Sequence, residues 1–197
     1  SYYNYNASTV QKDIYTSFRY TINENLSIMP SIHYFDISTD VLRPTSDSSA
    51  AKLVDTSFSE LAFATSLIKE SERSTNVFGI SISNFSNLTQ YQLNYDRTWY
   101  PKFNLNQYYT MSFVTQIDGQ HMGFGAGFNG GWKISSHLWF ESGIKFSNMS
   151  NFTESTGLTA YNISDIAFFR FNTKAIFLIG KHLQFTLEFE RQSNRLR

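Results

Sequence analysis

The stretch MGFGAGFNGGWKI, residues 122–134, decides how this chain of 197 residues folds. Every second position carries a mostly apolar side chain, including Met122, Phe124, Phe128 and Trp132, and the positions between them are glycine, asparagine or lysine. Successive side chains of a β-strand point to opposite faces. The stretch therefore predicts a strand with one apolar face and one small or polar face.

The same period of two continues on both sides of this strand. Alternating runs at residues 107–117 and 138–147 flank it, and short turns join the three. Seven more segments alternate in the same way, at residues 13–22, 26–35, 58–68, 77–85, 88–100, 166–177 and 182–190. No segment of useful length follows the 3.6-residue period of a helix. We therefore expect an all-β chain, an antiparallel up-and-down barrel of about ten strands in a single domain of residues 1–197.

The segments between these runs are polar. Residues 1–11 are expected to form a tail or the end of an earlier strand, and residues 36–57 and 148–162 are expected to be long loops rich in serine, threonine and asparagine or aspartate. Pro30 lies inside the second predicted strand. Because proline has no backbone N–H, a bulge or local break is expected there.

The composition excludes several classes of protein. Charged residues make up 16% of the chain, against roughly 25% in an ordinary soluble domain, and aromatic residues make up 17%. The formal net charge is zero, which gives no electrostatic case for nucleic acid as a partner. The absence of cysteine removes disulfides and thiolate sites. No apolar run approaches the roughly 20 residues of a spanning helix, so the chain can cross a bilayer only as a closed barrel.

The orientation of the apolar face decides between a membrane barrel and a soluble one. The predicted strands run about 9–13 residues, close to the length needed to cross a membrane at a tilt. Their polar faces are rich in glycine, serine, threonine, asparagine and glutamine, with the charges grouped. We therefore expect the apolar face to look outward at lipid, with Phe124, Phe128, Phe140, Phe185 and Leu187 as lipid-facing residues.

The grouped charges predict a network on the inward face. Acidic and basic side chains fall on adjacent strands, where opposite charges can pair across the ladder. The expected members are Arg19, Glu141, Lys145, Arg170, Lys174, Glu188 and Glu190. Arg19 joins the set only if closure of the barrel brings the first strand beside the last. The alternative is a set of surface salt bridges on a soluble sheet, each worth about 0–1 kcal/mol.

Tryptophan placement is consistent with a membrane. Trp99 and Trp132 lie within a few residues of short turns, on the apolar register, and are expected to form an interface girdle. Trp139 falls on the polar register, which weakens this pattern. Arg97 lies on the apolar register near the same end, where its guanidinium could reach headgroups.

The turns carry a resemblance to a known class of protein. The phrases INENL at residues 22–26, ISSHL at 134–138 and IGKHL at 179–183 resemble periplasmic turns of Gram-negative outer-membrane β-barrels, particularly those of Bacteroidota. The resemblance implies a porin-like transmembrane β-strand fold in the bacterial outer membrane, with the lipid bilayer and other envelope proteins as partners. It implies no activity. Unlike such barrels, this chain would place both ends on the long-loop side, so either one strand at each end is miscounted or the chain belongs to a larger barrel.

The residues that usually carry chemistry form no site in this sequence. The four histidines show no metal-ligand spacing. Hydrolases of the outer-membrane barrel class resemble one another in a His-x-Ser-Asn motif, and in the similar segment at residues 191–194 this chain has Arg191 in place of the histidine. The alternating glycines 123–127 lie within a strand and predict either room for a bulky neighbour or curvature of the wall. We expect no catalytic residue, no metal and no cofactor.

These observations favour one function and leave two alternatives. The favoured function is an outer-membrane barrel that acts as a structural or partner subunit or a narrow channel, with the loops at 36–57 and 148–162 for recognition. The first alternative is a soluble lipocalin-like carrier of a hydrophobic ligand. The second is an outer-membrane barrel enzyme that acts on lipid or peptide.

Overall fold

The computed structural model describes residues 9–44, 51–85, 88–119, 121–149, 152–153, 160–161, 166–179 and 183–195. Within these ranges every regular element is a β-strand. The strands are β1 (Thr9–Ser17), β2 (Tyr20–Asn23), β3 (Leu26–Pro44), β4 (Ala51–Ser71), β5 (Ser74–Phe85), β6 (Leu88–Trp99), β7 (Gln107–Asp118), β8 (His121–Lys133), β9 (Leu138–Met149), β10 (Phe152–Thr153), β11 (Ala160–Tyr161), β12 (Ile166–Ile179) and β13 (Leu183–Arg195).

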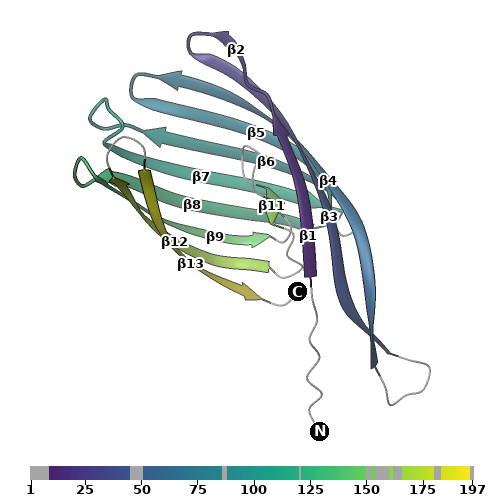
Figure 1. The fold of residues 1–197 in the computed structure, drawn as a ribbon. Coiled ribbons are helices and arrows are strands. Elements are labelled where there is room, and N and C mark those ends of the chain that lie inside the picture. The colour runs from purple at the N-terminus through teal and green to yellow at the C-terminus, as the bar shows by residue number, and fades with distance from the viewer. Residues whose placement is uncertain are drawn as a thin grey trace.

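Eleven of these strands form one curved antiparallel sheet (Figure 1). The order is β1-β3-β4-β5-β6-β7-β8-β9-β12-β13, with β2 also paired to β3, so β1 and β2 share one position and the sheet is ten strands wide. This confirms the prediction of an antiparallel up-and-down sheet of about ten strands. The sheet is not closed, since β1 and β13 are its two edges. Strands β10 and β11 pair separately with each other.

The hairpin of β3 and β4 corrects the prediction of a long loop at residues 36–57. The two strands stay paired from Leu26↔Lys69 to Pro44↔Ala51, and only residues 45–50 separate them. The prediction was wrong because it equated serine and threonine content with a loop. Threonine, valine and isoleucine have branched β-carbons that suit a strand, and these residues recur through the segment. Figure 1 shows the end of β3 and the start of β4 at the same end of the sheet as the start of β1 and the end of β13.

Pro30 has its expected effect, but in the neighbouring strand. Strand β3 runs through Pro30 without interruption, whereas the strand beside it breaks between Ser17 and Tyr20 into β1 and β2. The N–H of Phe18 still donates to the Pro30 carbonyl at 3.0 Å. Because Pro30 has no N–H to return, the partner strand loses its ladder at this point.

Two other expected boundaries also move. Strand β1 begins at Thr9, so residues 9–11 belong to the first strand, and not to a tail or to an earlier strand as predicted. Residues 1–8 lie outside the described part. The predicted loop at 148–162 contains the end of β9 at Met149 and the small β10–β11 pair. Its remaining residues lie outside the described part.

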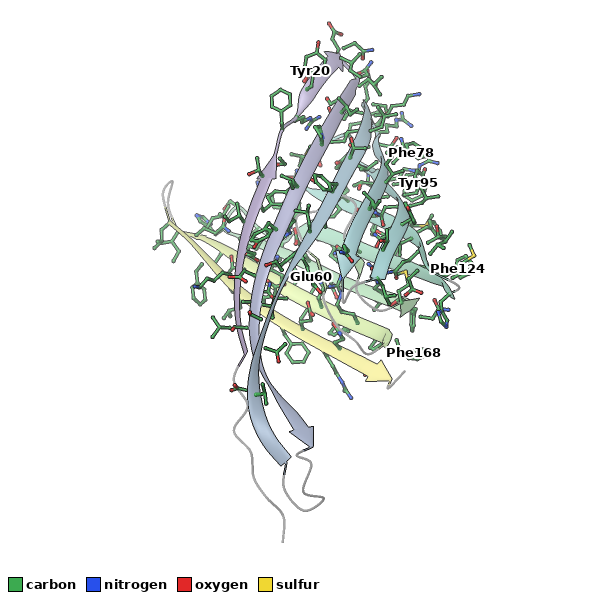
Figure 2. The ribbon with its side chains drawn as sticks, turned by 90° about the vertical axis from the view of Figure 1, so that its right-hand side faces the viewer. Tyr20, Glu60, Phe78, Tyr95, Phe124 and Phe168 are labelled. Atoms are coloured by element: carbon green, nitrogen blue, oxygen red, sulfur yellow. The ribbon has the colours of Figure 1, made fainter. Side chains whose placement is uncertain are left out.

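The two faces of the sheet differ sharply in exposure. On β6, Gln90, Gln92 and Asn94 on the inner, concave face are buried, and Gln90 is only 2% exposed. Leu93, between them on the outer, convex face, is 60% exposed. Figure 2 shows Phe78, Tyr95 and Phe124 on the outer side of the sheet.

A small apolar core interrupts the polar concave face. It consists of Phe35, Ile37 and Ala62 on β3 and β4. Among the described residues, no helix is both long and apolar enough to span a membrane.

Candidate functional site

The middle of the concave face holds a pocket of about 610 Å³. It extends from β5 to β13, so seven strands contribute to one surface. Its polar lining consists of Asn94, Asp96, Thr98, Tyr108, Thr110, Ser112, Asn129, Lys145, Arg170, Asn172, Lys174, Glu188 and Glu190. Five of the seven predicted members of the charged network are in this set.

Register places two of the cations side by side. Lys145 on β9 is the direct partner of Arg170 on β12. Like charges directly opposite each other on a ladder are unfavourable. The same row continues through Gly127 and Ser112 to Asp96 on β6, which puts one carboxylate across the pocket from the two cations.

Opposite charges meet in the next rows. Lys174 is the register partner of both Glu141 and Glu188, and its Nζ lies 3.5 Å from the Glu188 carboxylate. Glu190 pairs in register with Asn172, between the two charged rows. The structure therefore brings Glu141, Lys174 and Glu188 together on neighbouring strands.

Glu141 is also held by two aromatic side chains. The Tyr108 hydroxyl donates to Glu141 Oε1 at 2.9 Å, and Trp139 Nε1–H donates to the same oxygen at 3.0 Å. Tyr108 and Trp139 stack with ring centroids 5.9 Å apart. Charge-assisted hydrogen bonds of this kind are stronger than neutral ones, so this cluster fixes one end of the concave face.

Arg19 does not join this network. Its guanidinium lies 3.1 Å from Glu70 Oε1 on β4 and donates to Ser27 Oγ at 3.3 Å. The prediction that Arg19 would lie beside Glu188 and Glu190 required the first and last strands to meet, and β1 and β13 remain separate edges. Arg19 thus forms its ion pair with Glu70, which lies two strands away at the same side of the sheet.

The residues expected to face lipid all lie on the convex face. Phe124 is 50% exposed, and Phe128, Phe185 and Leu187 are exposed to a similar extent. Phe140 is 36% exposed. These four phenylalanines and the leucine are not packed together in an interior.

The two predicted girdle residues lie on the same convex face. Trp132 stacks on Phe140 with centroids 6.3 Å apart, and Trp99 pairs in register with Tyr109. Trp139 lies on the opposite, concave face, in agreement with its polar register.

The glycines make room for neighbouring side chains. A Cβ on Gly125 would lie 2.7 Å from a Val114 methyl, and one on Gly131 would lie 2.2 Å from Cε1 of Tyr108. Tyr108 and Gly131 are register partners, so the Tyr108 ring lies across β8 and reaches Glu141 on β9. Of the two interpretations of these glycines, room for a bulky neighbour therefore agrees with the structure.

A second polar cluster near β1 was missed by sequence reasoning. His33 is buried on the concave face, with Nε2 3.5 Å from Asp13 and its ring stacked 4.0 Å from Phe35. Asp36, three residues further along β3, is exposed on the other face. Following the alternation of faces from β3 to its neighbour β1 would have placed Asp13 and His33 on one face. The same reasoning would have placed Tyr108 and Glu141 on one face.

Within the described residues, no group of three or more histidines and carboxylates is arranged to hold a metal ion. No family model matches the chain, and no curated protein matches it in sequence.

A solved structure of a FadL homologue from Pseudomonas aeruginosa has a similar fold. Its TM-score is 0.61 at 11% sequence identity, and the match covers 96% of this chain and 61% of that chain. The chain therefore spans about three-fifths of the length of the structure it resembles. At this identity the likeness shows the fold, which is the wall of a β-barrel.

Proposed function

We propose that the chain forms part of the wall of an outer-membrane β-barrel and that its concave face lines a narrow aqueous path. One observation carries the proposal: polar side chains are buried on the concave face and large apolar side chains are exposed on the convex face of the same strands. In water this arrangement would leave the apolar convex face in contact with solvent. In a bilayer it places aromatic and aliphatic groups against acyl chains.

The concave face supports a wet interior. Asn129 lines the pocket, and among the described residues its buried Oδ1 has no protein hydrogen-bond partner. Buried polar atoms are normally satisfied by protein or by water. Gln92, Asn94, Thr98 and Thr110 continue the polar surface towards β5.

The soluble-carrier alternative needs the opposite orientation. A carrier of a hydrophobic ligand would turn rings such as Phe124 and Phe185 into its cavity. On the described strands those rings lie on the convex face. The role we propose is not catalytic.

The two edge strands of the sheet, β1 and β13, need pairing partners in a membrane. A strand edge exposed to hydrocarbon leaves N–H and C=O groups unsatisfied at a cost of several kcal/mol each. We therefore infer that further strands pair with β1 and β13, supplied by the same polypeptide or by a partner envelope protein. The match covers only 61% of the FadL homologue, so the rest of that chain has no counterpart in this one, which supports the inference.

Fractionation tests the membrane assignment directly. The folded protein is expected to remain with the membrane pellet after alkaline carbonate washing and to enter solution only with detergent. It should also migrate differently on gels with and without boiling, because a barrel wall stays folded in detergent at room temperature. A protein that is soluble, folded and unshifted without detergent would refute the proposal.

Charge reversal tests the aqueous path. In planar bilayers at low salt, the variant Lys145→Glu/Arg170→Glu should shift selectivity towards cations by on the order of tenfold. One unit charge at about 10 Å in water is worth ~0.4 kcal/mol, and the variant changes the wall by four units. The matched control is Lys69→Glu, an exposed position on the convex face. Equal shifts in both variants, or none in either, would contradict a path lined by Lys145 and Arg170.

A further inference from the structure

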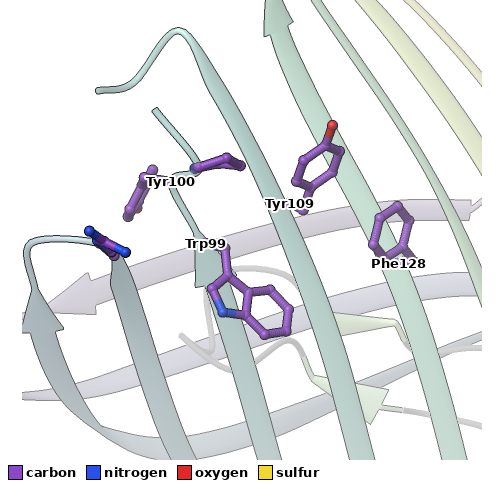
Figure 3. A pocket seen from close by; sticks show the side chains of 6 residues that line it. Trp99, Tyr100, Tyr109 and Phe128 are labelled. Atoms are coloured by element: carbon purple, nitrogen blue, oxygen red, sulfur yellow. The ribbon is translucent and has the colours of Figure 1, made fainter. Parts of the chain in front are cut away.

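A second pocket lies on the convex face, near the end of the sheet that carries the β4–β5 and β6–β7 turns. It has a volume of about 530 Å³ and is lined by Arg73, Trp99, Tyr100, Pro101, Tyr109 and Phe128. Figure 3 shows Trp99, Tyr109 and Phe128 placed across neighbouring strands. The pocket lies on the opposite face of the sheet from the polar pocket, and Phe128 contributes to the lining of both.

The walls of this pocket are aromatic and come from three strands. Trp99 on β6 is the register partner of Tyr109 on β7. The Tyr109 ring lies 6.0 Å from Phe128 on β8 and meets Trp132 edge-on at 5.8 Å. Gly130, the register partner of Tyr109, adds no side chain between them. An apolar hollow therefore opens outward, on the side where the proposed function places acyl chains.

Arg73 lines the hollow, and Arg97 lies next to it, over the ring of Trp99. The Arg73 guanidinium lies 3.9 Å from the ring centroid of Phe103, and the Arg97 guanidinium lies 4.7 Å from the ring of Trp99. Among the described residues neither arginine forms an ion pair. Stacking uses the flat face of a guanidinium and leaves the N–H groups in its plane able to donate.

The turn that holds Arg73 is fixed by the backbone. The N–H of Tyr100 donates to the Arg73 carbonyl at 2.8 Å, and the N–H of Phe103 donates to the Tyr100 carbonyl at 3.1 Å. Phe103 adopts a φ of 54°, which is uncommon for a residue other than glycine. This conformation places its ring under Arg73, so the guanidinium is positioned before any ligand arrives.

We propose that this pocket binds a glycerophospholipid, with the phosphate diester against Arg73 and Arg97 and one acyl chain in the aromatic hollow. The proposal rests on the membrane placement proposed above. Arginine recognises phosphate through several in-plane N–H donors, and aromatic rings gather at the headgroup level of a bilayer. The occupant is thus a lipid with a negatively charged phosphate, not a neutral apolar molecule.

Native mass spectrometry of the protein in detergent tests the site. With added phosphatidylglycerol, the wild type should retain one lipid, and Arg73→Gln should bind it about tenfold more weakly, as expected for the loss of a hydrogen bond to a charged group. Arg73→Lys should retain part of the affinity. Lys133→Gln is the matched control, because Lys133 is exposed at the same end of the sheet but lies on the concave register.

Two more measurements identify the ligand. Phosphatidylglycerol with brominated acyl chains should quench tryptophan fluorescence saturably, and Trp99→Phe should lose most of the saturable part. Diacylglycerol, which lacks the phosphate, and inorganic phosphate, which lacks the acyl chain, should each fail to compete. Equal retention by wild type and Arg73→Gln, or competition by diacylglycerol, would overturn the proposal. If only the lipid site is wrong, the protein should still require detergent to leave the membrane. If the membrane assignment is wrong, that requirement should be absent as well.

Discussion

Arginine in place of Leu93 is expected to reduce the free energy of unfolding from a bilayer by about 2–4 kcal/mol. Leu93 lies in the middle of β6 and is 60% exposed on the convex face. Its register neighbours are Ile80 on β5 and Thr115 on β7, so no acidic side chain is beside it to pair with the new charge. A guanidinium at this depth must be desolvated, or must distort the bilayer to reach water.

The matched control is Ile134→Arg. Ile134 is 62% exposed, almost the same as Leu93, but it lies in the turn between β8 and β9. Near the interface the same substitution should cost only about 0–1 kcal/mol. Urea unfolding in phospholipid vesicles, followed by gel mobility, measures both. If the two variants lose equal stability, or if Leu93→Arg is neutral, the convex face does not lie against lipid.

The second large effect is expected at Gly131. Substitution by alanine places a Cβ 2.2 Å from Cε1 and 2.6 Å from Cζ of Tyr108. Because the Tyr108 ring is also tied to Glu141 by its hydroxyl, it cannot move away without losing that hydrogen bond. Overpacking of this kind typically costs about 1–3 kcal/mol. We expect Gly131→Ala to unfold at correspondingly lower urea concentration.

Gly127→Ala provides the comparison on the same strand and face. Its Cβ would come no closer than 3.2 Å to another atom, the Ile144 carbonyl oxygen, so the effect should be much smaller. The double variant Gly131→Ala/Tyr108→Ala removes the clashing ring. In that background the alanine at position 131 should cost little, giving a favourable coupling energy in a double-mutant cycle. Additive losses in the cycle would show that the Tyr108 ring is not what Gly131 accommodates.

The charged residues show how far local pattern can place a site. The alternation of side chains along each strand predicted that six charged residues share one face: Glu141, Lys145, Arg170, Lys174, Glu188 and Glu190. In the structure all six lie on the concave face, on three strands that are neighbours in the sheet. The alternation pattern could not show that Lys145 would lie beside Arg170 and not beside an acidic side chain. That depends on the offset between β9 and β12, which are separated in the chain by residues 150–165.

Arg19 and the segment 36–57 show where the pattern was insufficient. The partner of Arg19 depends on whether β1 meets β13, and it proved to be Glu70 on β4. The segment 36–57 has the composition of a loop, yet 16 of its residues lie in β3 and β4 (36–44 and 51–57). Their backbone groups are satisfied by each other across the hairpin, a property that neither half has alone.

The sequence by itself determined that this chain is built of antiparallel strands with one apolar and one polar face, because alternation along a strand depends only on adjacent residues. The tertiary structure alone decided which strands are edges, which charges meet, and that Tyr108 crosses Gly131 to reach Glu141. These features depend on register between segments distant in the chain, and register is fixed when the whole sheet assembles.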